Sequence, residues 1–434
     1  MQHYFKIGFQ KLALACLAVS CLFFFTCTSP QKTENTSLIN TDHLDHLYES
    51  INIDGRTLGT IWIYAEAPDY HLVADDDEGF TCVDDVARAL VFYVRQYAHE
   101  PNEKGLEKIR SLTEFLLYMQ ADNGYFYNFL LPGPQINKTH QNSLPIANWW
   151  SWRAFWALSE MGLLKEEKLT ELQNRSRPVM DTLIGKMEQI CPTTDSLQYF
   201  EGIPTPDCLV DLGSDQPAVM MVGLTNYYRQ QPSERVKLLL TRFGNLLLKT
   251  QQGDAKTPPH FAFLSWRNYW HAWGNSQAYA LLYAGRVLQN QPFIEAGLNE
   301  VRYFYPYCLK NGFMSGFKMA VENDQPVVKD IQPFSQIAYG LRPMVYASLE
   351  AFAITGDTTF AETAGKLGTW LFGSNPANQT LYDSTNGRTF DGIGSPSEVN
   401  KNSGAESTIE GLLTLQAIEL RGSKRMGFCR SNTF

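Results

Sequence analysis

The hydrophobic positions of the chain alternate between two kinds of segment. Some segments are apolar on almost every side, which is typical of buried helices, and between them lie helical patterns with one apolar and one charged face. The apolar segments begin near Cys82, Ala147, Ser214, His271, Phe334 and Ser403. The amphipathic segments cover about 104–120, 165–189, 233–250, 293–310 and 358–372, with a shorter one near 42–52. The pattern predicts six inner and six outer helices in alternation.

The near-constant spacing of the apolar segments, about 57–69 residues, indicates a repeat of helical hairpins. Closed on itself, such a repeat forms an all-α (α/α)6 toroid whose inner helices line the hole. We expect one such domain over residues 41–420, because no Pro/Gly/Ser-rich linker divides this range. An open solenoid is the alternative, but solenoid repeats are usually shorter, at about 34–47 residues.

Five long connections lead from an outer helix into the next inner helix, whereas the return connections are short. Loops of this length without secondary structure of their own are uncommon unless they have a function. All five enter the N-terminal ends of inner helices, so they share one rim of the toroid, and we expect the functional site there. The long connections are 121–146, 190–213, 251–270, 311–333 and 373–402.

The N-terminal segment has the pattern of an export signal followed by a tether. A basic start precedes the apolar run 12–25, which is too short to span a bilayer comfortably. The arrangement resembles a bacterial lipoprotein signal over residues 1–27, with Cys27 or Cys21 as the lipidated residue and a polar tether over 28–40. An ordinary secretory signal and an uncleaved anchor are the alternatives. In each case we expect an exported protein of the bacterial cell envelope, periplasmic or anchored in the outer membrane.

Composition narrows the class of protein. Of the 434 residues, 44% are hydrophobic and 13% aromatic, which excludes a disordered or fibrous chain. The net charge of −9 argues against a nucleic-acid partner. Residues 421–434 are expected to form a mobile polar tail, and the sequence predicts no oligomeric state.

The cysteines and acidic runs predict neither a metal nor a cofactor. No CxxC or HExxH motif is present, so a zinc site has little support. The stretch 75–85 is dense in the oxygen ligands that calcium prefers, which leaves a calcium role open, but its spacing does not match an EF-hand loop and we do not claim a calcium site. Cys191 and Cys208 flank a Pro-rich loop and could form a disulfide, although nothing in the sequence requires it.

Two helix openings on the expected rim carry carboxylates. The first inner helix opens with Thr81 as the expected N-cap, followed by Asp84 and Asp85. Helix capping and an i,i+4 pair between Asp84 and Arg88 explain such acids without any function. However, this helix has almost no polar face to carry two carboxylates into solvent. Asp84 or Asp85 is therefore a candidate base that activates water.

The last inner helix opens with Ser403 and Glu406, which have the spacing of a capping box. Capping competes with catalysis as the explanation for Glu406, our candidate general acid. Glu410 lies one turn deeper in an apolar stretch and is the alternative acid.

Seven of the nine tryptophans fall in two short windows beside polar residues. Flat aromatic faces with polar neighbours suit a sugar ring, which has apolar C–H faces and hydroxyl edges. Core packing is the competing explanation, above all for Trp152 and Trp156. The residues expected to contact substrate are Asn148, Trp149, Trp150, Arg153, Asp215, Trp270, His271, Trp273 and Asn275, with Tyr125, Asn128 and Asp391 from turn-bearing loops.

Three segments, 79–90, 148–158 and 402–408, resemble the six-hairpin glycosidase superfamily of (α/α)6-barrel enzymes that act on glycans. The first is similar to a G-Y-x-x-D-D-x-A-R-A-L helix opening of uncharacterised members. The last is similar to the region in which cellulase-like members carry a glutamate acid. The resemblance implies that Asp84 or Asp85 is the base and Glu406 the acid.

These observations together predict an exported glycoside hydrolase with a carbohydrate substrate. We expect an inverting mechanism, in which the two carboxyl groups stand about 6.5–9.5 Å apart. One alternative is a polysaccharide lyase on the same scaffold, which would use Tyr, His or Arg beside a uronate. A terpene cyclase would explain the acids at 75–78, but export argues against it. A non-enzymatic, glycan-binding surface lipoprotein is the third alternative.

Overall fold

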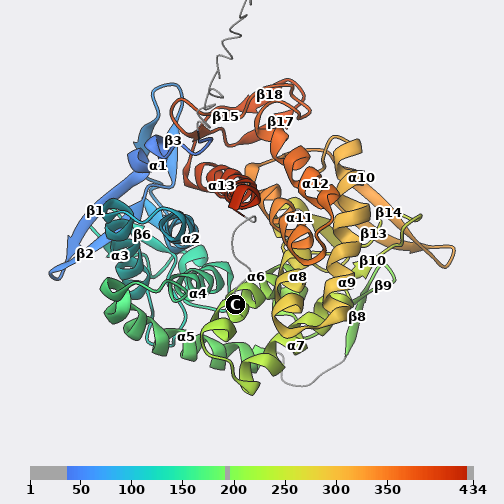
Figure 1. Cartoon of the computed structure of the whole chain (residues 1–434), viewed down its shortest axis with the longest axis horizontal. Helices are drawn as coiled ribbons and strands as arrows, with labels where there is room; N and C mark the ends of the chain where they lie inside the picture. Colours follow the sequence, from blue (N-terminus) through green and yellow to red (C-terminus); the bar gives the residue numbers. More distant parts are fainter. Residues whose placement is uncertain (1–36, 191–195, 428–434) are drawn as a thin grey trace, which may run out of the picture. The chain divides into compact units, whose positions relative to one another are not determined.

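Residues 37–190 and 196–427, the part of the chain that the computed structural model describes, fold into a closed ring of helical hairpins (Figure 1). Side chains are described up to residue 420. The expected signal segment 1–27 with Cys21 and Cys27, most of the tether, Cys191 and residues 428–434 lie outside the described residues.

Six inner helices of the described part form the ring, and each contacts the next one along the chain. Helix α13 also contacts α2, so the ring is closed, which confirms the expected toroid and excludes an open solenoid. Their nearly continuous apolar sequence is buried: in α4, every residue after the first is buried. The inner helices are α2 (Val83–His99), α4 (Trp149–Met161), α6 (Asp215–Gln230), α8 (Gln277–Leu288), α11 (Arg342–Thr355) and α13 (Ala405–Gly427).

The outer helices pack an apolar stripe against this ring and expose their charged face, as the hydrophobic pattern predicts. In α7, for example, Val236, Leu240, Phe243 and Leu247 are buried, whereas Leu238 on the opposite side is 58% exposed. The outer helices are α3 (Glu103–Tyr118), α5 (Thr170–Ile190), α7 (Glu234–Leu248), α9 (Gln291–Asn299), the π-helical turn η5 (Glu300–Phe304), α10 (Tyr305–Lys310) and α12 (Thr358–Gly368).

The sixth outer position differs from the expected helix over 42–52. Helix α1 (Asp42–Leu47) is short, and the chain continues into an antiparallel hairpin of β1 (Tyr48–Ile53) and β2 (Arg56–Ile61). Asp54 and Gly55 both have positive φ at the turn. An Asp-Gly turn between alternating β-branched residues favours a hairpin, and this local signal ends the helix early.

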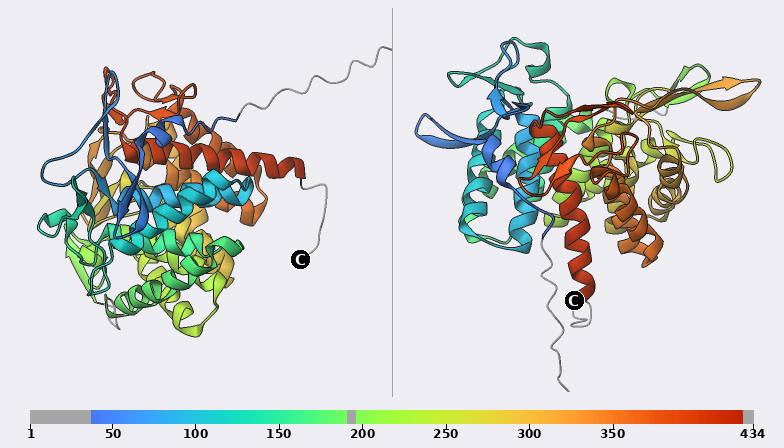
Figure 2. Two further views of the ribbon diagram at one scale, coloured as in Figure 1. Left: turned by 90° about the vertical axis from the view of Figure 1, so that its left-hand side faces the viewer. Right: turned by 90° about the horizontal axis from the view of Figure 1, so that it is seen from above.

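The long connections also contain strands, so the prediction that they lack secondary structure was wrong. In the right-hand view of Figure 2 they gather at one end of the helices, where the inner helices begin. Before α2 the chain forms β3 (Tyr64–Glu66), β4 (His71–Val73) and β5 (Thr81–Cys82). The strands of the long connections are β6 (Phe129–Leu131), β7 (Gln135–Ile136), β8 (Leu197–Phe200), β9 (Ile203–Pro206), β10 (Gln251–Gln252), β11 (Ala262–Phe263), β12 (Tyr269–His271), β13 (Gly316–Glu322), β14 (Gln325–Gln332), β15 (Tyr382–Asp383), β16 (Arg388–Thr389), β17 (Gly392–Ser395) and β18 (Glu398–Asn400).

Two of the inner helices begin later than expected. Trp270 and His271 belong to β12, which pairs with β13, so α8 starts only at Gln277. Helix α11 starts at Arg342 rather than near Phe334, after the 3₁₀ turn η6 (Ala338–Gly340), and Pro343 occupies its first turn. Proline is favoured at that position because its missing N–H has no partner there in any case.

The remaining features concern the ends of the chain and its cysteines. Helix α13 continues past residue 420, through the first part of the expected tail, to Gly427. None of the helices in the described ranges is long and apolar enough to cross a membrane. Cys208 is disulfide-bonded, whereas Cys82 and Cys308 are free and buried.

Candidate active site

The N-terminal ends of the inner helices surround a cavity of about 740 Å³, which we call the main cavity. Asp84, Asp215 and Glu406 stand in the first turns of α2, α6 and α13, and all three line it. Unpaired backbone N–H groups give a helix N-terminus a partial positive charge, which stabilises carboxylates there. The volume of the main cavity is in the usual range for small-molecule sites.

Asp84 presents one bound and one free carboxylate oxygen. Its Oδ2 contacts the guanidinium of Arg153 and lies 3.8 Å from Nη2 of Arg88. The backbone N–H of Asp84 donates to Oδ1 of Asn128 at 3.2 Å, which fixes the helix start. Oδ1 of Asp84 is buried and has no hydrogen-bond partner within the described part of the chain. An ion-paired carboxylate with a free oxygen can accept a hydrogen bond from a sugar hydroxyl or a water.

Asp85 does not line the main cavity and is 3% exposed. Its Oδ1 accepts a hydrogen bond from Arg88 at 2.5 Å, and its Oδ2 accepts one from the Cys82 thiol at 3.2 Å. Burial raises the pKa of Asp85 to about 6, against the opposing effect of the Arg88 charge. Cys82, rather than the expected Thr81, caps the helix, because the Thr81 hydroxyl accepts from the backbone N–H of Ile61. Asp85 is therefore placed to support the site and not to touch a substrate.

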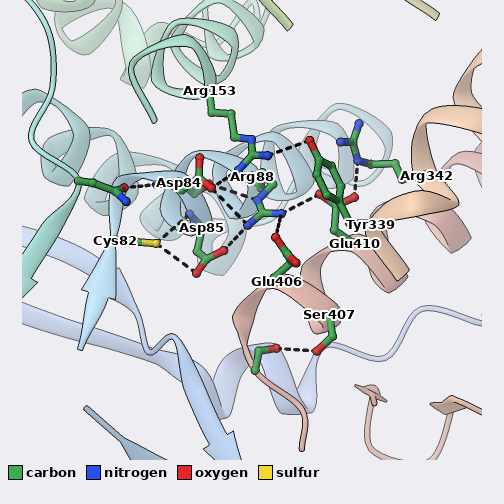
Figure 3. A network of polar contacts seen from close by, with 12 residues as sticks. Cys82, Asp84, Asp85, Arg88, Arg153, Tyr339, Arg342, Glu406, Ser407 and Glu410 are labelled. Carbon is green, nitrogen blue, oxygen red and sulfur yellow. Dashed lines mark hydrogen bonds and ion pairs between the residues drawn. The ribbon is translucent and has the colours of Figure 1, made fainter. Parts of the chain in front are cut away.

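Arg88 joins the first inner helix to the last (Figure 3). Its Nη1 donates to Oε2 of Glu406 at 3.0 Å and to Oε1 of Glu410 at 3.1 Å. Arg342 contacts the other oxygen of Glu410. Glu410 is completely buried, whereas the Glu406 side chain is 45% exposed and lines the main cavity. Of the two acids considered for α13, only Glu406 can reach a substrate.

The capping box expected at the start of α13 does not form. The helix begins at Ala405, and the hydroxyl of Ser403 donates to the backbone oxygen of Thr389 at 2.8 Å. Glu406 is thus free of a capping role, and its carboxylate is held by Arg88 instead.

Tyr339 covers the same cluster from η6. Its hydroxyl accepts a hydrogen bond from Nη2 of Arg153 at 2.8 Å. The guanidinium groups of Arg88, Arg153 and Arg342 lie 5.4, 5.0 and 5.3 Å from the centre of its ring. The cluster therefore holds three guanidinium groups and four carboxyl groups. Its carboxyl groups belong to Asp84, Asp85, Glu406 and Glu410.

Aromatic side chains also line the main cavity. The Arg153 guanidinium lies 5.1 Å from the centre of the Trp149 ring, and the Trp150 indole donates to a backbone oxygen at 2.7 Å. Trp273 is 38% exposed. The expected residues that line the main cavity are Asp84, Asn128, Trp149, Trp150, Arg153, Asp215, His271, Trp273 and Glu406.

Asp215 and His271 form a second polar pair in the main cavity, with Oδ2 and Nε2 at 3.2 Å. Burial raises the pKa of Asp215, although the imidazole and the backbone N–H of Gln216 lower it. Nδ1 of His271 is buried and has no partner among the described residues. The His271 ring lies 5.1 Å from that of Trp273.

Trp270 and Asn275, two expected substrate contacts, lie in the core. Trp270 is 1% exposed and stacks on Phe317 at 5.4 Å between ring centres. Asn275 is also 1% exposed, and its side-chain amide donates to the backbone oxygen of Gly340 at 3.2 Å. Both residues lie there because β12 and η4 (Ala272–Gly274) stand where the helix was expected to start.

Asn148 and Tyr125 have structural positions as well. Asn148 is the N-cap of α4, and its Oδ1 accepts from the backbone N–H of Trp149 at 2.8 Å. Tyr125 packs edge-on against Trp152, with ring centres 5.9 Å apart. Neither residue lines the main cavity.

Several residues of the main cavity were not predicted as substrate contacts. Trp266 belongs to the second of the two sequence windows rich in tryptophan, so the sequence did carry a signal for it. Tyr339 was missed because α11 was expected to start before it, and Pro343 was the signal for the later start. The unpredicted lining residues are Phe129, Asn142, Val210, Asp211, Gln216, Trp266, Tyr269, Ile337 and Tyr339.

A second cavity of about 470 Å³ adjoins the main one and shares Ile337, Tyr339 and Glu406 with it. Asp391, expected to contact substrate, lines this second cavity. Its Oδ1 accepts from the backbone N–H of Gly404 at 2.9 Å and from the Ser407 hydroxyl at 2.7 Å. Burial raises the pKa of Asp391, against these hydrogen bonds.

The acidic stretch before α2 forms a turn. Oδ1 of Asp75 accepts from the backbone N–H groups of Asp77 and Glu78, both at 2.8 Å. Across residues 37–190 and 196–427, no group of three or more His, Cys, Asp or Glu side chains is arranged to hold a metal ion.

Comparisons with known proteins identify the fold. No family model matches the chain, and neither does any curated protein sequence. A sugar epimerase from a ruminal bacterium matches with a TM-score of 0.61 and 14% identity, over 89% of this chain and 96% of that one. The cellobiose 2-epimerase of Bacillus thermoamylovorans gives 0.59 and 12%, over 87% and 95%. A family 76 α-mannanase of Bacteroides thetaiotaomicron gives 0.56 and 8%, over 89% and 94%. The chain therefore shares the (α/α)6 fold of these proteins, which is the fold that the sequence resemblance implied.

Proposed function

We propose that the protein is a glycoside hydrolase in which Asp84 and Glu406 are the carboxylate pair. One observation carries the proposal: both side chains line the main cavity, and both contact the buried guanidinium of Arg88 from opposite ends of the chain. The tryptophan rings that line the main cavity suit the apolar faces of a sugar.

In the proposed reaction, the Glu406 carboxyl gives its proton to the leaving glycosidic oxygen as the bond from that oxygen to the anomeric carbon breaks. The Asp84 carboxylate takes a proton from the water whose oxygen bonds to that carbon. The products are a sugar with a free anomeric hydroxyl and the released alcohol. Because the cluster has one carboxyl more than it has guanidiniums, one carboxyl can hold a proton while the cluster stays neutral.

We propose an inverting course for this reaction. The two carboxylates contact the guanidinium of Arg88, which lies between them. Inverting enzymes keep room for a water between the carboxyl groups, whereas retaining enzymes bring them to about 5–5.5 Å. Proton NMR of the first product formed would distinguish the two, because only inversion gives the anomer opposite to the substrate.

The charges of the main cavity argue against a lyase that acts on uronates. Arg153 is its one arginine among the described lining residues, and this arginine is already paired with Asp84 and Tyr339. The similar solved structures, by their titles, include a mannanase and sugar epimerases, which supports a sugar as the substrate.

The pair of Asp215 and His271 favours a second candidate function, a sugar epimerase or isomerase. An imidazole held by a carboxylate at 3.2 Å can remove and return a proton at a carbon beside a carbonyl group. Such a reaction would leave the mass of the substrate unchanged, whereas hydrolysis adds one water.

The deciding experiment is mass spectrometry of products from a panel of oligosaccharides, with Asp84→Asn and Glu406→Gln as variants. We expect cleavage with one water added, reduced at least about 100-fold in both variants. Asp76→Asn and Glu362→Gln, at exposed positions outside the cavities, are the matched controls and should keep full activity. Unchanged mass with altered stereochemistry would support the epimerase, and binding without any product would leave a glycan-binding protein.

We further propose that the protein is exported as a lipoprotein. The N-terminal sequence pattern supports this, as does disulfide-bonded Cys208, since structural disulfides form mainly outside the cytosol. The test is mass spectrometry of the protein expressed in bacteria. A lipid mass should be present in the wild type and lost with Cys27→Ala or, if the other cysteine is used, Cys21→Ala.

A further inference from the structure

The main and second cavities meet at the proposed acid. Glu406, Tyr339 and Ile337 belong to the walls of both, so the two cavities lie side by side at Glu406, and together we call them the cleft. With volumes of about 740 and 470 Å³, each is large enough for a small-molecule ligand. A substrate held in only one cavity would leave the other without an occupant.

The two halves of the cleft differ in their walls. The main cavity presents the tryptophan rings, whereas the described lining of the second cavity contains no tryptophan and includes Gly392, Gly394 and Gly404 beside Tyr64 and Tyr339. Asp84 lines the main cavity and is absent from the second. Water activated by Asp84 therefore attacks from the main cavity, and the sugar that it attacks lies there. The leaving part of the substrate must lie on the other side of Glu406.

Charge restricts what the second cavity can bind. Asp391, Glu398 and Glu406 line it, and none of its described lining residues is a lysine, arginine or histidine. A uronate, sulfate or phosphate group would face these carboxyl groups without a cation, which is unfavourable in a partly buried site. Hydroxyl groups, by contrast, can donate to carboxylate oxygens.

We propose that a neutral glycan chain occupies both cavities and is cleaved at an internal bond over Glu406, with at least two sugar units released on the leaving side. This inference rests on the proposed hydrolysis and adds the class of substrate and its direction in the cleft. The attacked sugar stacks on the tryptophans, and the leaving units occupy the second cavity.

Gly394 offers a way to close the second cavity alone. A Cβ added there would meet only the Glu398 carboxylate, at 3.2 Å, and Gly394 has no positive φ that would strain a side chain. Gly394→Phe therefore places a ring in the second cavity without disturbing Asp84 or the tryptophans. Gly365→Phe is the matched control, since a Cβ at Gly365 on α12 meets nothing within 4 Å.

The assay uses neutral manno- and gluco-oligosaccharides of two to six units, labelled with 2-aminobenzamide at the reducing end. We expect labelled products of two or more units and kcat/KM that rises with length on the labelled side. Gly394→Phe should remove that rise, with a loss of at least about tenfold for the longest substrate. Gly365→Phe should match the wild type.

Three results would overturn the inference. Release of single labelled units, or a Gly394→Phe variant equal to Gly365→Phe, would show that the second cavity holds no substrate, while hydrolysis itself would stand if Asp84→Asn abolishes it. Equal cleavage of oligogalacturonates would contradict a neutral substrate. Failure to cleave any oligosaccharide of the series would overturn the inference and the proposed hydrolysis together.

Discussion

Nη1 of Arg88 lies 3.0 Å from Oε2 of Glu406, a hydrogen bond between residues 318 positions apart in the chain. The guanidinium is 1% exposed, and it also contacts Asp84, Asp85 and Glu410. It therefore closes the ring between α2 and α13 and holds the proposed catalytic carboxylates in one place.

Arg88→Met should destabilise the protein by about 3–5 kcal/mol, because it takes their shared cation from the buried carboxylates of Asp85 and Glu410. The loss should be smaller at pH 5 than at pH 8, since protonation relieves the repulsion between carboxylates. Urea unfolding at both pH values measures the effect. Arg110→Met, at an exposed position of α3, should change the free energy of unfolding by less than about 0.5 kcal/mol. Equal stability of the wild type and Arg88→Met would show that the cluster does not hold the ring together.

Trp270 and Trp273 lie close together in the sequence, but their substitutions should affect different properties of the protein. Trp273 is 38% exposed in the main cavity, so Trp273→Ala should raise KM roughly 3–10-fold, from about 0.5–1.5 kcal/mol of lost stacking, at nearly constant kcat. Trp270 is buried against Phe317, so Trp270→Ala should cost about 3–5 kcal/mol of stability. Steady-state kinetics and thermal unfolding of both variants test this. A stability loss confined to Trp273→Ala would contradict the assignment.

Glu300 should make stability depend on pH. Its carboxyl is 1% exposed in η5, where it accepts from the backbone N–H of Phe263 at 2.9 Å, and burial raises its pKa to about 8. The unfolded chain loses this proton near pH 4.5 while the folded protein keeps it, so stability falls as pH rises from about 4.5 to 8. The slope from this group is up to about 1.4 kcal/mol per pH unit.

Glu300→Gln removes that proton exchange and keeps a neutral hydrogen-bonding side chain. Its thermal unfolding temperature should exceed that of the wild type at pH 8 by more than at pH 5. Glu295→Gln, at an exposed position of the neighbouring helix α9, should show no such difference. A Glu300→Gln variant whose unfolding temperature follows the wild type at every pH would refute a neutral Glu300 in the folded protein.

Asp215→Asn separates the two candidate functions. In a hydrolase that uses Asp84 and Glu406, Asp215 orients His271 in the sugar site, and the substitution should lower kcat/KM less than about tenfold. In an epimerase, the loss should reach about 100-fold or more, because the histidine loses the carboxylate that holds it. Kinetics of Asp215→Asn and Asp84→Asn on one substrate give the comparison, and the variant with the greater loss identifies the reacting pair.

The sequence was sufficient for the order of the helices, because six nearly continuous apolar segments can only be buried together. It was less reliable where strand pairing competes with that pattern. Trp270 and His271 were expected at a helix start, but they pair with Phe317 and Gly316 in a sheet. The helical pattern carries no signal for strand pairing between distant segments. For α11, only Pro343 marked the true start of the helix.

For the candidate site, position at a helix entrance was enough to predict that Asp84 and Glu406 lie on the rim, where both line the main cavity. It could not separate Asp84 from Asp85, because the difference comes from Arg88 and Cys82, which turn Asp85 into the interior. The pairing of Arg88 with Glu406 and Glu410 joins opposite ends of the chain, and spacing within one helix carries no information about it.

Because the ring closes through its last helix, the proposed site is complete only late in synthesis. Asp84 emerges early from the ribosome, but its proposed partner Glu406 and the closing contact of α13 with α2 exist only once almost the whole domain has been made. A nascent or truncated chain that ends before α13 carries the tryptophans and the proposed base without the proposed acid. We therefore expect no hydrolysis from such a fragment until the last helix has been made.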